Sequence, residues 1–67
     1  MAAWTFNARA FALMMLHEYA RAIQDLDQAI RINPNYQNAY QIRAAAKRAL
    51  GDAAGAAADL KRSQQTP

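Results

Sequence analysis

The stretch YARAIQDLDQAIRINP, residues 19–34, decides the fold class of this 67-residue chain. Its apolar side chains recur at the i, i+3, i+4, i+7 spacing of a single helix face, at Tyr19, Ala22, Ile23, Leu26, Ala29 and Ile30. Proline cannot continue a helix, and it disfavours helical geometry in the residue before it, so Asn33-Pro34 should end the segment. The stretch therefore predicts an amphipathic helix over 19–32 that stops at a sharp break.

Two further breaks divide the rest of the chain. Glycine suits the end of a helix and aspartate suits the start of the next, so Gly51-Asp52 predicts a turn between helices. His17-Glu18 marks a weaker break of the same kind. We therefore expect four helices, at about 4–16, 19–32, 37–50 and 53–63, followed by a frayed tail over 64–67.

The composition agrees with an all-α fold. Alanine supplies 18 of the 67 residues and valine is absent, so helix-forming residues far outnumber strand-forming ones. The chain also has no cysteine, which excludes disulfides, thiolate zinc sites and a cysteine nucleophile. A chain of this length forms one small domain at most.

The sequence repeats itself with a fixed period of about 34 residues, which is the separation of Arg9 from Arg43. Moving the sequence along itself by this period aligns eight identical pairs, which are Arg9/Arg43, Ala10/Ala44, Ala12/Ala46, Leu16/Leu50, Ala20/Ala54, Ala22/Ala56, Asp25/Asp59 and Leu26/Leu60. Each copy contains two of the expected helices. The sequence therefore predicts two helix–turn–helix units.

This period of about 34 residues, together with its pattern of residue types, resembles the tetratricopeptide repeat family. The first copy supplies the aromatic, small and apolar residues of that pattern and its closing proline, at Phe6, Ala10, Leu13, Ala22, Leu26, Ala29 and Pro34. The second copy supplies Tyr40, Ala44, Ala56 and Leu60. The resemblance implies one all-α domain over 1–67 of two stacked repeats, an α-solenoid fragment, with repeat one at about 3–36 and repeat two at about 37–67. A generic four-helix bundle is the alternative.

Repeat two departs from the pattern. Lys47 stands where a buried apolar residue is usual, and Ser63 replaces a packing alanine. We expect repeat two to be poorly packed or incomplete, and to lack a capping helix.

No set of residues predicts catalysis, a cofactor or a metal ion. The lone histidine, His17, falls at a turn, and Asp25 and Asp27 lie two apart on a helix and so point in different directions. There is no glycine-rich phosphate loop and no metal-ligand spacing. We expect a protein that is not an enzyme.

Two arginine–aspartate pairs recur with the same separation, Arg9 with Asp25 and Arg43 with Asp59. Because the acid repeats together with the base, we interpret them as ion pairs that join the two helices of each repeat. The alternative is that the arginines contact a ligand.

The first helix carries more large apolar residues than one face can hold. Phe6, Ala10, Leu13 and Leu16 suit packing on the second helix, which leaves four others on a different face. In the family that this chain resembles, the first helix of each repeat lines a concave, partner-binding groove. The resemblance therefore implies a groove lined by Trp4, Asn7, Phe11, Met14, Met15, Asn38, Gln41, Ala45, Arg48 and Ala49.

Some members of the family clamp a terminal carboxylate with a lysine and an asparagine of the first repeat. Asn7 and Phe11 occupy those two positions here, which argues against that activity.

The predicted function is a non-catalytic protein–protein interaction module that binds a peptide or an amphipathic helix in this groove. The alternative is a self-assembling unit, a homodimer, or a piece of a longer array, in which the apolar first helix is an oligomer contact. The net charge of +3 includes the Lys47-Arg48 and Lys61-Arg62 pairs, but nucleic acid is the less favoured partner because no long basic run is present. The apolar segment 10–16 is too short to span a bilayer, so we expect a soluble, cytoplasmic protein with no membrane partner.

Overall fold

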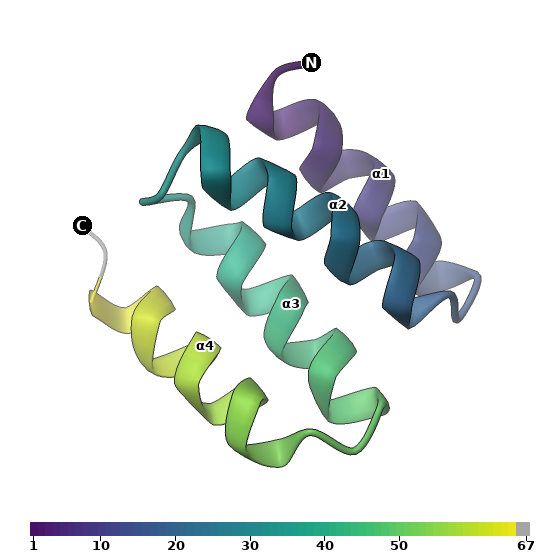
Figure 1. Ribbon diagram of the computed structural model, residues 1–67, viewed down its shortest axis with the longest axis vertical. Coiled ribbons are helices and arrows are strands. Elements are labelled where there is room, and N and C mark those ends of the chain that lie inside the picture. Colours follow the sequence, from purple (N-terminus) through teal and green to yellow (C-terminus); the bar gives the residue numbers. More distant parts are fainter. Residues whose placement is uncertain (66–67) are drawn as a thin grey trace.

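Four helices and no strands make up the computed structural model, which describes residues 1–65 (Figure 1). They are α1 Ala3–Met15, α2 Tyr19–Ile32, α3 Gln37–Ala49 and α4 Ala53–Gln65. The all-α prediction is confirmed, and every helix end lies within two residues of its expected place. Gln64 and Gln65 continue α4 instead of fraying, and residues 66–67 of the expected tail lie outside the described part of the chain.

The same turn closes both helix pairs. His17 has a φ of 60°, and Gly51, its counterpart in repeat two, has a φ of 88°. In each case the next residue donates its N–H back to a carbonyl five residues earlier, Glu18 to Leu13 at 2.9 Å and Asp52 to Lys47 at 2.8 Å. This left-handed closing turn is the usual use of glycine at a helix end. His17 adopts it as an exposed turn residue, as its place in the sequence predicts.

The break between the repeats is held by side chains. The Asn33 side chain accepts the Asn35 N–H at 3.1 Å, and the Tyr40 hydroxyl donates to the Pro34 carbonyl at 2.8 Å. At the next break, Asp52 Oδ1 accepts the Gly55 N–H at 2.8 Å, so Asp52 caps α4 as predicted.

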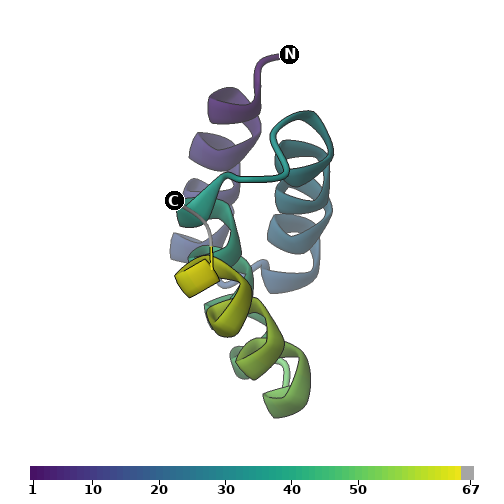
Figure 2. The ribbon, with the colours of Figure 1, turned by 90° about the vertical axis from the view of Figure 1, so that its left-hand side faces the viewer.

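The four helices pack in chain order, α1 on α2, α2 on α3 and α3 on α4. Helices α1 and α3 also contact one another directly, whereas α2 and α4 do not come together within residues 1–65. The array is therefore curved, with α1 and α3 on its inner side and α2 and α4 on its outer side (Figures 1 and 2).

Small residues form most of the core. Ala10, Ala22, Ala29 and Ala39 are completely buried, and Leu26 is the largest side chain that is fully enclosed. Alanine at these positions lets the helix axes approach closely, so burial here comes mainly from backbone-to-backbone proximity.

Two packing predictions are wrong. Leu16 does not pack on α2, because α1 ends at Met15 and the turn carries Leu16 outward, leaving it 67% exposed. Repeat two is not poorly packed, since α3 and α4 lie against one another as closely as α1 and α2 do, whereas its being incomplete stays a prediction. Ser63 fits there because it is buried with its hydroxyl donating to the Leu60 carbonyl at 2.7 Å.

Candidate functional site

The groove positions implied by the sequence lie on the inner helices, α1 and α3. Trp4, Phe11 and Met15 are 67%, 58% and 70% exposed, which is unusual for side chains of this size. The groove positions on α3 are exposed as well. They are Asn38, Gln41, Ala45, Arg48 and Ala49. Most of the predicted surface is thus accessible and lies on one side of the array.

Two members of the set are less accessible. Met14 is half-buried and packs against the core cluster, because it lies close to the helix face that meets α2 and α3. Asn7 is also half-buried, and its Nδ2 donates to Asn38 Oδ1 at 2.9 Å. This hydrogen bond joins α1 to α3 across the inner side, so Asn7 helps to hold the two helices in one surface.

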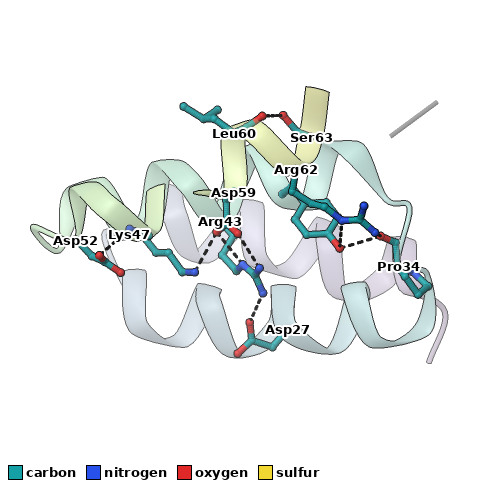
Figure 3. Close-up of polar contacts among 11 residues, drawn as sticks. Asp27, Pro34, Arg43, Lys47, Asp52, Asp59, Leu60, Arg62 and Ser63 are labelled. Carbon is teal, nitrogen blue, oxygen red and sulfur yellow. Dashed lines mark hydrogen bonds and ion pairs between the residues drawn. The ribbon is translucent and has the colours of Figure 1, made fainter. Parts of the chain in front are cut away.

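Both predicted ion pairs form. Arg9 Nε and Nη2 donate to the two oxygens of Asp25, each at 2.7 Å. Arg43 Nε and Nη2 donate to those of Asp59 at 2.9 and 2.7 Å (Figure 3). The aspartates are buried, so each bidentate pair links the helices of its repeat from inside.

Two contacts in repeat two were missed by sequence reasoning. Arg43 Nη1 donates to Asp27 Oδ1 of α2 at 2.9 Å, which joins repeat two to repeat one. Lys47 Nζ lies 3.1 Å from Asp59 Oδ2, which explains how a lysine is accepted at this partly buried position. Asp27 and Asp59 stand 16 residues before and after Arg43, but only the docking of α3 on α2 decides that the pair with Asp27 also forms.

These contacts shift the ionisation of the network. Burial by itself would raise the pKa of Asp59, but hydrogen bonds from Arg43 and Lys47 outweigh it, and the pKa lies below its usual value. The hydrogen bond to Asp59 correspondingly raises the pKa of Arg43. Asp59 is therefore ionised in the folded protein well into the acid range.

A dependence of stability on pH follows. The folded-state pKa of Asp59 is lower than its unfolded value of about 3.9, so its stabilisation is complete above that value and is lost as pH falls through the folded pKa. We expect the free energy of unfolding, measured by urea denaturation, to fall between pH 5 and pH 2. The Asp59→Asn variant should be less stable at pH 7 and should lose less on acidification. Equal acid sensitivity of the two proteins would contradict this assignment.

Other chemistry is sparse in the described residues. Within 1–65, no three His, Asp or Glu side chains gather where they could hold a metal ion. None of the helices in this range is long and apolar enough to cross a membrane. A pocket of about 210 Å³ lies between α1 and α2, away from the groove positions.

Curved pairs of antiparallel helices, closed by matching turns and repeated along the chain, define an α-helical repeat protein. The chain belongs to the tetratricopeptide repeat family, whose sequence profile matches residues 3–36, and the prediction from the sequence is confirmed. Repeats of this family generally mediate protein–protein interaction and are not enzymes.

One relative is RNA polymerase II-associated protein 3 of Xenopus tropicalis. It is 44% identical over 54 residues, which is 81% of this chain but 8% of the relative. The chain thus corresponds to a small part of that protein. No solved structure matches the chain at a significant level.

Proposed function

We propose that the chain is a non-catalytic, cytoplasmic interaction module that binds an amphipathic helix or peptide on the inner side of α1 and α3. One observation carries the proposal, namely that Trp4, Phe11 and Met15 project from α1 without being covered. Large apolar side chains grouped on a surface mark binding sites in soluble proteins. Aromatic residues and methionine are also the residue types enriched at the centre of protein interfaces.

The two inner helices differ in chemistry, which favours an amphipathic guest. Helix α1 offers aromatic and methionine side chains, and α3 offers Asn38, Gln41 and Arg48. A guest with apolar residues along one side and polar or acidic residues along the other matches both edges. Such a helix binds through apolar anchors three or four residues apart.

The basic residues support a protein partner more than nucleic acid. Lys47 is held by Asp59, and the Arg62 guanidinium lies over the Tyr40 ring, 5.5 Å from its centroid. One basic residue of each Lys-Arg pair therefore makes its contact within the protein. Arg48 and Lys61 remain, on different helices, and do not form the continuous basic stripe typical of nucleic-acid binding.

The proposal predicts that Phe11→Glu abolishes partner binding. A random-peptide phage library is selected on the wild-type chain, and one enriched peptide is then titrated into each variant. Placing a carboxylate in the centre of an apolar contact should weaken binding at least tenfold. Ala20→Glu, on the exposed side of α2, should leave the affinity unchanged. Peptides that bind the wild type and Phe11→Glu equally would contradict the proposal, as would a library that yields no binder.

Self-association through the same surface is the second candidate. The exposure of Trp4, Phe11 and Met15 favours it, because a symmetric dimer would cover them with their own copies. The candidate predicts a mass that rises with concentration in sedimentation and that Phe11→Glu returns to the monomer value. A wild-type chain that is folded and monomeric at micromolar and near-millimolar concentrations would exclude the dimer and leave the groove for a separate partner.

A further inference from the structure

The pocket between α1 and α2 is a candidate site separate from the groove. It is lined by Arg9, Leu13, Arg21, Gln24 and Asp25, and α3 and α4 contribute none of these side chains. Three of the five are charged and one is an amide. The pocket therefore suits a polar or ionic group.

The second repeat shows what fills the corresponding place there. One repeat period further along the chain, the lining residues become Arg43, Lys47, Gly55, Ala58 and Asp59. Asp27 enters this arrangement from α2, with its Oδ1 2.9 Å from Arg43 Nη1 (Figure 3). A carboxylate on a neighbouring helix is thus the natural occupant in repeat two.

Arg9 is arranged like Arg43, except that no carboxylate of a neighbouring helix pair within residues 1–65 contacts it. Both arginines use Nε and Nη2 on the aspartate of their own repeat, and both lie over an aromatic ring, Phe6 at 5.7 Å and Tyr40 at 5.5 Å. Nη1 of Arg9, however, has no hydrogen-bond partner among residues 1–65. The Arg9 side chain is 54% exposed, against 18% for Arg43.

Charge also favours an incoming anion. In repeat two, Lys47 adds a second cation beside Asp59, but its counterpart in repeat one is Leu13. Arg21 supplies the second cation instead. It is paired with Glu18 at 2.7 Å in an exposed contact between neighbouring turns, and such pairs contribute little and rearrange readily.

We propose that this pocket binds an Asp or Glu side chain on a helix of another protein, which packs against α1 as α2 packs against α3. Arg9 Nη1 donates to the carboxylate and Arg21 turns toward it. The surface is distinct from the groove, so the module can hold two partners at once.

A second copy of this chain does not fit the pocket. Stacking two copies in this way would bring α4 of one onto α1 of the other, and α4 carries Lys61 where α2 carries Asp27. Lys61 would then face Arg9. Gln64 stands where α2 carries Ile30, which packs against the core, and Ala57 stands where it carries Ile23, so α4 offers less apolar surface.

The test places on α4 the carboxylate and the apolar residues that α2 carries at the equivalent positions. The chain with Ala57→Ile, Lys61→Asp and Gln64→Ile presents the residues of α2, and Phe11→Glu is added to suppress contacts through the groove. We expect this variant to associate end to end, with a sedimentation mass that rises from micromolar to near-millimolar concentration. Replacing Lys61→Asp by Lys61→Asn should weaken association about tenfold, because a charge-assisted hydrogen bond is lost.

Arg9→Lys in the same variant isolates the site. Lysine can keep the charge beside Asp25 but lacks the third donor of the guanidinium, so association should again weaken about tenfold. The proposal is overturned if the variant is helical by circular dichroism yet monomeric throughout, or if Lys61→Asn or Arg9→Lys leaves association unchanged. It is also overturned if the chain with its natural Lys61 stacks through Arg9, since a second copy would then be the occupant.

Discussion

Arg43→Ala should destabilise the protein more than the loss of any other single charge, by roughly 2–3 kcal/mol. Removing the arginine leaves the buried Asp59 with only Lys47 and breaks the link to Asp27 between the repeats. Uncompensated buried carboxylates are costly, and the expected value lies below that of a fully enclosed pair because Lys47 remains. Urea denaturation followed by circular dichroism measures the loss.

Arg9→Ala is the matched control, since Arg9 holds the equivalent place in repeat one. It is more exposed and makes no contact with a second helix pair in residues 1–65. Its removal leaves Asp25 without a cation, but Asp25 lines an open pocket where water can hydrate the carboxylate, so the loss should be smaller. Equal effects of the two substitutions would show that the contact to Asp27 contributes nothing. A stable Arg43→Ala protein that no longer binds a selected peptide would instead assign Arg43 to ligand contact.

Ala22→Leu should destabilise by about 1–3 kcal/mol, because the added side chain has no space at the crossing of α1 and α2. Ala22 is completely buried in the core cluster with Ala10 and Leu13. A domain of this size has little stability in reserve. We therefore expect a visible loss of helical circular dichroism at room temperature, or a melting temperature lowered by several degrees.

Ala20→Leu provides the control on the same helix. Ala20 is exposed, so leucine there changes helix propensity only slightly and extends toward solvent. Its melting curve should match the wild type. If Ala22→Leu also melted like the wild type, the close approach of α1 and α2 at this residue would be wrong.

The candidate site was predictable in part. The repeat period placed Trp4, Phe11 and Met15 in equivalent positions to α3 residues, and their exposure agrees with a surface role. The repeat period did not predict that Met14 packs against the core while its neighbour Met15 is exposed. Residues at the edge of a helix face differ in burial only once a second helix packs against them. The pocket at Arg9 could not be predicted from the sequence either, since it depends on whether an adjoining helix places a carboxylate beside the arginine.

By itself, the sequence determined the helices, their ends and the ion pairs within each repeat. These depend on local periodicity, on Pro34 and Gly51, and on a separation of 16 residues between arginine and aspartate that recurs in both helix hairpins of this chain. Only the tertiary structure decided the outward position of Leu16, the contact of Arg43 with Asp27 and the open donor of Arg9. The last two depend on how repeat two docks on repeat one. That geometry arises from the packing of Ala39 and its neighbours against α2, and no period in the sequence specifies it.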